Sequence, residues 1–140
     1  MNLVVDASVA AKWLFVEPDT GKARAILDSA ESGELQLLAP EILPAEVANS
    51  LWKRTQRGDL DRASAMGLFD GFQRVEFKFS SVQELIEPAL SIAFRQHHPV
   101  YDCLYVVLAR REGCDLVTAD ERLYKAFARD SRVRLLRTLS

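Results

Sequence analysis

The sequence predicts an α/β fold with a mostly parallel central sheet flanked by helices. Short apolar runs rich in Val and Leu alternate with longer segments in which apolar residues recur at helical spacing. Because helical segments separate the runs, consecutive strands need crossover connections, and these favour parallel pairing. The 140 residues suit one domain, so we expect a single domain over residues 1–140.

The first half of the chain alternates strands and helices between clear breaks. An apolar, β-branched run predicts a buried strand at 3–5. Pro18 and Gly33 interrupt the helical spacing that follows, and Pro44 favours a helix start because its missing N–H costs nothing in the first turn. The expected elements are a strand at 3–5, helices at 7–15 and 20–30, a strand at 35–38 and a helix at 44–57.

The second half continues the alternation with stronger helix signals. Ser81 and Glu84 have the spacing of a capping box, whereas Pro88 predicts a kink or a late start for the same helix. A strongly apolar helix is expected to end at Gly113. The expected elements are a helix at 61–73, a strand at 75–79, helices at 81–95 and 101–112, a strand at 115–118, a helix at 121–128 and a strand at 133–136.

The composition is that of an ordinary globular protein, with 49% hydrophobic and 27% charged residues. No apolar run approaches the roughly 20 residues of a membrane span. The first residues, MNLVVDAS, lack a basic segment and a cleavage site, so we do not expect a signal peptide there. They predict a strand instead.

The charge balance argues against a protein that coats nucleic acid without specificity. Eighteen basic and 20 acidic residues give a net charge of −2, although a nuclease, whose site must be acidic, stays compatible with that value. Near the C-terminus the sign reverses, and there either a solvated face or a contact with an RNA backbone is expected. The residues concerned are Arg129, Arg132, Arg134 and Arg137, with Asp130 as the one acid among them.

The cysteines and histidines carry no metal-binding pattern. Cys103 and Cys114 lie at opposite ends of one predicted helix, too far apart for the Cα separation of roughly 4.4–6.8 Å in a disulfide. We therefore expect reduced core thiols in a cytosolic protein. His97 and His98 precede Pro99 in a turn, and we expect surface imidazoles there, with RNA contact as the alternative.

Four acidic residues stand at borders between apolar runs and turns: Asp6, Glu46, Asp102 and Asp120. Asp6 directly follows the first strand, and Asp120 follows the 115–118 strand by two residues. Because parallel strands end at a common edge of the sheet, topology places these two acids on the same edge. Their local sequence also fits helix N-caps, and one carboxylate can serve both purposes.

Glu46 and Asp102 occupy apolar settings, in which an unpaired carboxylate would be costly to bury. Glu46 could instead complement a helix dipole, and Asp102, at the start of a helix that is apolar on nearly every side, is either a cap or a ligand. If the four acids converge, they form an oxygen-rich site that suits Mg²⁺ or Mn²⁺ rather than zinc.

These residues belong to segments through which the chain resembles the PIN-domain ribonucleases, in particular the VapC-type toxins of toxin–antitoxin pairs. The resemblance covers nearly all of the chain, and Cys103 stands where the family more often has alanine. The segments are VVDAS at 4–8 followed by KW at 12–13, APE at 39–41, EVAN at 46–49, YDCLY at 101–105 and LVTAD at 116–120.

The resemblance implies a PIN-like three-layer fold and endonucleolytic hydrolysis of RNA by metal-activated water. Asp6, Glu46, Asp102 and Asp120 would be the catalytic acids and would hold one or two Mg²⁺ or Mn²⁺ ions. A cognate VapB-type antitoxin would cover the site with a basic side chain among the acids, and the toxin would form a homodimer. Supporting polar groups would come from Ser8, Asn49 and Thr118.

Contacts that select an RNA would involve basic residues such as Arg54, Arg57, Arg110 and Arg122.

Two other functions are compared with the toxin. A PIN-like module that binds RNA or a partner without cutting is the alternative to the toxin, and its signature would be a lost acid. A receiver domain or dehalogenase-like phosphatase needs a second acid near the one that follows the first strand, where this chain has Ala7-Ser8.

Overall fold

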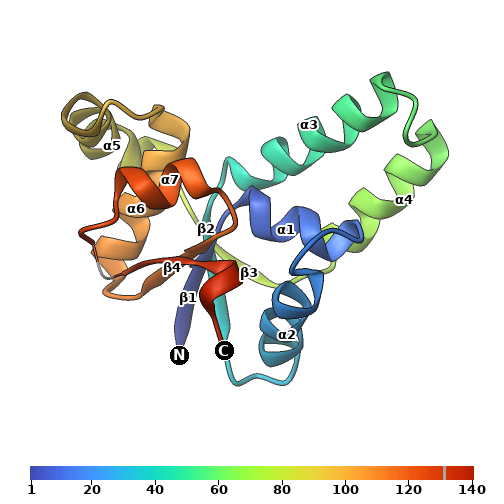
Figure 1. Ribbon diagram of the computed structural model, residues 1–140, viewed down its shortest axis with the longest axis horizontal. Coiled ribbons are helices and arrows are strands. Elements are labelled where there is room, and N and C mark those ends of the chain that lie inside the picture. Colours follow the sequence, from blue (N-terminus) through green and yellow to red (C-terminus); the bar gives the residue numbers. More distant parts are fainter. Residues whose placement is uncertain (131) are drawn as a thin grey trace.

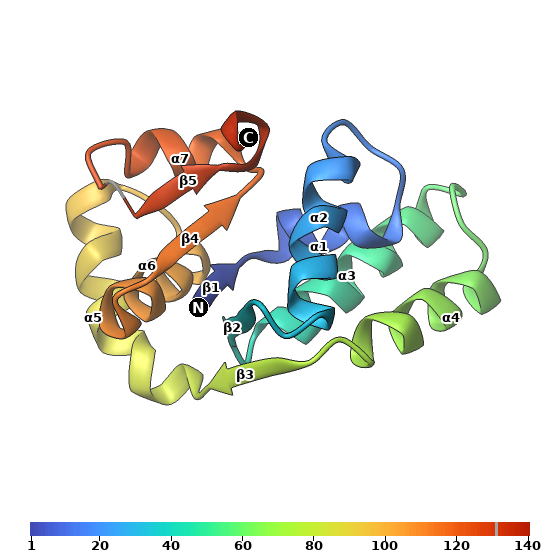
Figure 2. The ribbon, with the colours of Figure 1, turned by 90° about the horizontal axis from the view of Figure 1, so that it is seen from below.

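The computed structural model describes residues 1–130 and 132–140, and it confirms the predicted α/β class. Five strands form one sheet of order β3-β2-β1-β4-β5 in which every neighbouring pair is parallel. Figures 1 and 2 show helices on both sides of this sheet. The strands are β1 (Asn2–Val5), β2 (Gln36–Pro40), β3 (Phe77–Ser80), β4 (Asp115–Thr118) and β5 (Val133–Leu135).

Each predicted helix is found, and its ends lie within two residues of those expected. The late start that Pro88 allowed is not found, because Ser81 caps α5 through the Gln83 amide and the helix begins at once. The helices are α1 (Ala7–Leu14), α2 (Thr20–Glu31), α3 (Leu43–Gln56), α4 (Arg62–Gln73), α5 (Val82–Gln96), α6 (Val100–Glu112) and α7 (Glu121–Ala126), with a 3₁₀ turn at Leu136–Thr138.

The strand order reverses at β1, and this reversal positions the candidate site. From β1 the chain moves outward to β2 and β3, then crosses back to place β4 on the other side of β1. Val5 pairs in register with Val117, so that β1 and β4 end side by side. In open parallel sheets, the carboxyl ends of strands at such a reversal are where ligands bind.

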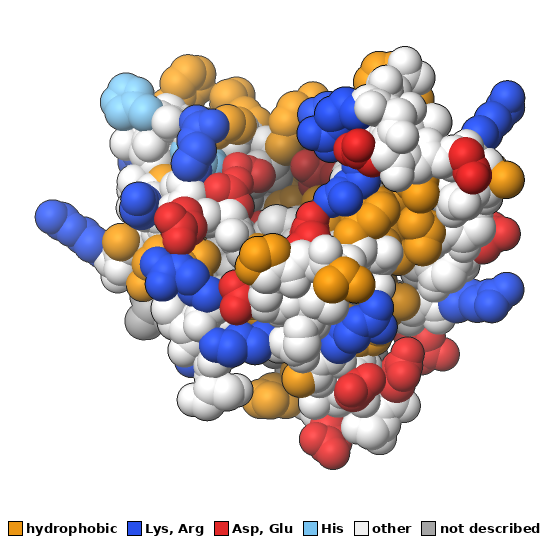
Figure 3. All heavy atoms as spheres, turned by 45° about the vertical axis from the view of Figure 1, so that its right-hand side comes forward, with side chains coloured by type: hydrophobic (Ala, Val, Ile, Leu, Met, Phe, Trp, Pro, Cys, Tyr) orange, Lys and Arg blue, Asp and Glu red, His pale blue; other side chains and the backbone are white. Residues whose placement is uncertain are grey.

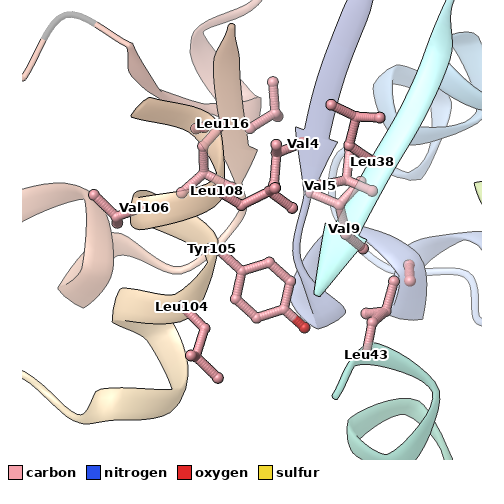
Figure 4. Close-up of a cluster of buried hydrophobic side chains, with 14 of the residues drawn as sticks. Val4, Val5, Val9, Leu38, Leu43, Leu104, Tyr105, Val106, Leu108 and Leu116 are labelled. Atoms are coloured by element: carbon pink, nitrogen blue, oxygen red, sulfur yellow. The ribbon is translucent and has the colours of Figure 1, made fainter. Parts of the chain in front are cut away.

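The core is built around α6, which is buried from Cys103 to Ala109. It packs against β1, β2 and β4 on one side and against α5 on the other, so no face of it is left for solvent along this stretch. Figure 4 shows the ring of Tyr105 among apolar side chains, with its hydroxyl directed away from α6, toward the side where Leu43 and α3 lie. A phenol in such a place needs a hydrogen-bond partner.

Two other features follow the expectations. Cys103 and Cys114 are both free and buried, as their separation along α6 requires. In the described part of the chain, the helices are all too short or too polar to span a membrane.

Helices α3 and α4 lie side by side and project beyond the sheet as an arm (Figure 1).

Candidate active site

Asp6 is both a helix cap and the most deeply buried acid of the predicted set. Its Oδ1 accepts from the amides of Ser8 at 3.1 Å and Val9 at 3.3 Å, which caps α1. The Ser8 hydroxyl also donates to Oδ1, and the Thr118 hydroxyl donates to Oδ2, both at 2.5 Å. Only 5% of the residue is exposed. The cap therefore anchors the carboxylate at the end of β1.

Ser8 and Thr118 also join the end of β1 to the end of β4. The Ser8 hydroxyl accepts from the Ala119 amide at 2.9 Å, and the Thr118 hydroxyl accepts from the Asp120 amide at 3.0 Å. The two hydroxyls lie 3.3 Å apart, and Thr118 is fully buried. This network fixes both strand ends around one carboxylate, as the strand-end positions of Asp6 and Asp120 predicted.

The charge of Asp102 on α6 acts on two other acids, Asp6 after β1 and Glu46 in the first turn of α3. Burial raises the pKa of Asp6 from 3.8 to about 6, against the lowering effect of its hydrogen bonds and with a further rise from the Asp102 charge. Burial likewise raises the pKa of Glu46, and the charges of Asp102 and Asp6 add to that rise. Like charges near a buried group disfavour ionisation, so these three acids form one electrostatic unit.

Tyr105 holds Glu46 in this unit and was not among the predicted site residues. Its hydroxyl donates to Glu46 Oε1 at 2.5 Å, and the side chain is 1% exposed. Burial, followed by the Glu46 charge, raises the pKa of Tyr105 above its usual range, so the phenol stays protonated as a donor. Its position three residues after Asp102 places both on one face of α6, which is the signal that the sequence did contain.

Replacement of Tyr105 by Phe should destabilise the protein without changing its fold. The ring volume is kept, but one hydrogen bond to a charged acceptor is lost, at a cost of about 1–3 kcal/mol in the free energy of unfolding. Urea unfolding at pH 7.5 in EDTA measures this change. Tyr101→Phe is the matched control, because Tyr101 is 61% exposed and should leave the unfolding midpoint unchanged. Equal midpoints for both variants would contradict a supporting role of the Tyr105 hydroxyl.

Asp102 is held by His98, a residue that we expected to lie at the surface. The predicted surface position of His98 is incorrect: its side chain is 7% exposed, and Nε2 lies 2.7 Å from Asp102 Oδ2. His97 is exposed, as expected. Asp102 does not cap α6, because Pro99 occupies the N-cap position and no side chain caps that end.

Asp120 caps α7 through Oδ1, which accepts from the amides of Arg122 at 2.8 Å and Leu123 at 3.4 Å. A common pattern joins it to Glu46 and Asp102. In the described chain, each of these three carboxylates has one oxygen held by a protein donor, while the other oxygen accepts no hydrogen bond from the protein.

Asn49 does not join this network. It is exposed one turn beyond Glu46 on α3, and it makes no side-chain hydrogen bond to any of the residues that the structure describes. We expected it as a supporting polar group, and it does not hydrogen-bond to Glu46, whose Oε1 accepts from Tyr105 instead.

The donor set fits a hard divalent cation, although the side chains are not gathered around a common point. Within residues 1–130 and 132–140, no three His, Cys, Asp or Glu side chains have the spacing of a formed metal site. The groups at this edge of the sheet are carboxylates and hydroxyls, and oxygen donors are those that Mg²⁺ and Mn²⁺ prefer. A cation would also offset the burial and the nearby negative charges that together raise the pKa values of Asp6 and Glu46.

Basic side chains lie along the same helices as the acids. Lys12, one turn after Ser8 on α1, lies 3.5 Å from a Glu17 oxygen. Arg54, two turns after Glu46 on α3, pairs with the other Glu17 oxygen at 2.5 Å and stacks over the Phe15 ring at 3.6 Å. Figure 3 shows acidic side chains grouped in a hollow of the surface, with Lys and Arg side chains beside them.

Of the other predicted basic contacts, Arg57 and Arg110 lie farther along their helices from the acids, whereas Arg122 follows Asp120. Arg57 pairs with Asp59 at 3.8 Å at the exposed end of α3, and Arg110 pairs with Asp130 at 3.1 Å. Arg122 is exposed directly after Asp120 and Glu121, at the start of α7.

The arginines near the C-terminus pair with nearby acids. Arg132 and Arg134 lie 3.9 and 3.8 Å from Asp115, and Arg137 lies 3.0 Å from Glu121. Asp115 begins β4, at the end of that strand opposite to the acids. The two pairs with Asp115 favour the solvated face over a contact with RNA near the site.

The comparisons with known proteins agree with this geometry. The PIN domain family matches residues 3–128, and the chain belongs to that family. The chain is 38% identical over 132 residues to ribonuclease VapC3 of Pyrobaculum aerophilum, with 91% of this chain and 95% of that protein covered. It is thus a PIN domain with VapC ribonucleases among its homologues.

Solved structures give the same fold. The crystal structure of PAE2754 from Pyrobaculum aerophilum superposes with a TM-score of 0.71 at 23% identity, over 99% of this chain and 94% of that one. The structure of VapBC2 from Rickettsia felis bound to a DNA fragment from its promoter superposes with a TM-score of 0.66 at 15% identity, over 96% and 97%. At these identities the likeness concerns the fold.

Proposed function

We propose that the protein is a metal-dependent endoribonuclease and the toxin of a toxin–antitoxin pair. The observation that carries this proposal is the position of buried Asp6 at the reversal of strand order, within electrostatic reach of Glu46 and Asp102. Burying carboxylates together is costly without a cation. The similarity to a VapC ribonuclease over most of both chains supports the same activity.

In this proposal Asp6, Glu46, Asp102 and Asp120 hold one or two Mg²⁺ or Mn²⁺ ions. The ion would supply a water acidic enough to attack phosphorus and positive charge for the phosphoryl oxygens. The protein's own part is to fix the carboxylates beforehand, and the hydroxyls of Ser8 and Thr118 do this for Asp6. Asn49 remains a proposed contact to the substrate only, since it is exposed beside the acids.

RNA would lie along α1 and α3, with its phosphates near basic side chains. Arg54 has the best support among the four predicted arginines, because it lies on the acid-bearing helix and is held by Glu17 and Phe15. Arg122 would contact the RNA backbone beside Asp120, and Arg57 and Arg110 would contact more distant phosphates. Contacts of this kind add affinity without reading sequence.

The proposal includes a VapB-type antitoxin, a homodimer and a cytoplasmic site of action. A solved neighbour of the same fold is a VapBC complex bound to promoter DNA, which supports the antitoxin. The antitoxin would place a basic side chain among the acids. A positive charge there would stabilise the ionised forms of Asp6 and Glu46, whose pKa values are raised by burial and by nearby negative charges. The free thiols suit a reducing compartment.

Metal removal tests the activity directly. The purified protein should cleave single-stranded RNA in Mg²⁺ or Mn²⁺, stop in excess EDTA and recover when Mn²⁺ is added back. A contaminating ribonuclease of the kind that needs no metal would continue in EDTA, which makes the chelator an internal control. RNA binding by gel shift without cleavage in either metal would instead favour the non-catalytic PIN-like module.

A further inference from the structure

The turn between α5 and α6 is built in an unusual backbone conformation. His97 ends α5 with φ of 51°, and it is one of two non-glycine residues with positive φ in the described chain, the other being Asp19. A side chain in this left-handed region costs of order 1 kcal/mol or more unless its surroundings impose it. The amide of His98 then donates to the Ala93 carbonyl at 3.2 Å, which directs the following side chain over the start of α6.

The imidazole of His98 is fixed on two sides. Its ring meets the Phe127 ring edge to face, with centroids 6.0 Å apart and planes at 78°. Its Nε2 lies 2.7 Å from Asp102 Oδ2. Because an ionised carboxylate only accepts hydrogen bonds, Nε2–H is the donor. Asp102 Oδ1 is left without a hydrogen bond from the described part of the protein.

We propose that His98 is a positioning residue that holds Asp102 for the bound cation. This inference rests on the proposed function, in which Asp102 is a metal ligand. The Asp102 side chain is 28% exposed, so without a partner it is free to turn toward solvent. One hydrogen bond on Oδ2 removes that freedom and leaves Oδ1 for the cation. Partners of this outer kind orient metal ligands, and their loss costs about 10–100-fold in metal affinity or activity.

A purely structural role for His98 is the competing explanation, because α6 has no side-chain cap and the pair spans one helical turn. The two roles make different demands on the side chain. A structural role against Phe127 needs volume, whereas a positioning role needs a donor at the place of Nε2. His98→Leu keeps volume and lacks the donor. His98→Gln carries an amide N–H that reaches a similar place.

Manganese binding separates these roles. Free Mn²⁺ is titrated by electron paramagnetic resonance against the wild type, His98→Leu, His98→Gln and the exposed-neighbour control His97→Asn, which tolerates the left-handed backbone. Circular dichroism and the thermal midpoint of each metal-free variant are recorded alongside. We expect His98→Leu to weaken Mn²⁺ binding about 10–100-fold, His98→Gln to recover most of the affinity, and His97→Asn to match the wild type.

The outcomes distinguish this inference from the function on which it rests. Wild-type affinity in His98→Leu, or equal loss in His98→Leu and His98→Gln with a lowered thermal midpoint in both, would overturn the positioning role and leave the metal site standing. Absence of Mn²⁺ binding by the wild type would overturn the metal site itself. If His98→Leu fails to fold, His98→Met takes its place, because methionine also fills the volume and has no N–H donor at the place of Nε2.

Discussion

Asp102→Asn should abolish metal-dependent RNA cleavage while leaving the protein folded. Asparagine keeps the size of the side chain, and its carbonyl oxygen still accepts from His98 Nε2–H, 2.7 Å away in the wild type. The negative charge is removed, and the oxygen proposed to bind the cation becomes an NH₂ group, which is a hydrogen-bond donor. Since loss of a ligand's outer partner alone costs about 10–100-fold, loss of a ligand's charge should lower the cleavage rate by at least about 100-fold.

The measurement is the single-turnover cleavage rate of a labelled RNA in saturating Mn²⁺, with the thermal midpoint as the check on folding. Asp28→Asn is the matched control, because Asp28 is an exposed acid on α2 and its replacement should leave the rate unchanged. Asp6→Asn should lower the cleavage rate to a similar extent as Asp102→Asn. Full activity in both site variants would remove these acids from the reaction and leave the fold without an assigned centre.

Much of the fold could be predicted because its signals are local. The apolar run at β1 and the breaks at Pro18, Gly33 and Gly113 each act within a few residues. Gly33 and Gly113 indeed have positive φ, at 84° and 63°. Alternation of strands and helices then left parallel pairing as the natural arrangement, and the strand-end positions of Asp6 and Asp120 followed from topology.

The residues that were missed depend on packing between distant segments. Tyr105 reaches Glu46 across 59 positions of the sequence, and its local signal is weak, because it is only a position one turn after Asp102 on an apolar helix. His98 was misplaced because a His-His-Pro turn is ordinarily exposed. Its burial follows from the left-handed conformation of His97. Such a conformation is usually predicted by a glycine, and this turn has none.

The metal-free protein should lose stability as the pH rises from about 4 to about 6. The pKa of Asp6 is raised by burial from 3.8 to about 6 in the folded state, so the folded protein binds a proton more tightly than the unfolded chain. The resulting stabilisation is complete below 3.8 and is lost as the pH passes the folded value. Its size is about 3 kcal/mol, since each pKa unit corresponds to about 1.36 kcal/mol. Glu46, whose pKa is also raised, acts in the same direction.

Asp6→Asn should therefore stabilise the metal-free protein at pH 7.5 although it destroys the proposed activity. The amide stays neutral at every pH, which removes the cost of a buried charge. Its oxygen retains the caps to the Ser8 and Val9 amides, and its NH₂ donates to the Thr118 hydroxyl, which rotates to act as acceptor. We expect a gain of about 1–3 kcal/mol in the free energy of unfolding, and a flatter dependence on pH.

Urea unfolding in EDTA at pH 4, 5, 6 and 7.5 tests this result, and Asp61→Asn is the control, because the pKa of Asp61 is shifted in the opposite direction. Asp61 also caps a helix, but it is exposed, and its hydrogen bond to the Ser64 amide lowers its pKa. With Asp61 replaced, the free energy of unfolding should still fall as the pH rises from about 4 to about 6. Saturating Mn²⁺ should stabilise the wild type at pH 7.5 and leave Asp6→Asn unaffected, because the cation selects the deprotonated carboxylate. A wild type whose metal-free stability rises from pH 5 to 7.5 would show that Asp6 is ionised without cost, and the buried charge would then offer no reason for a cation to bind.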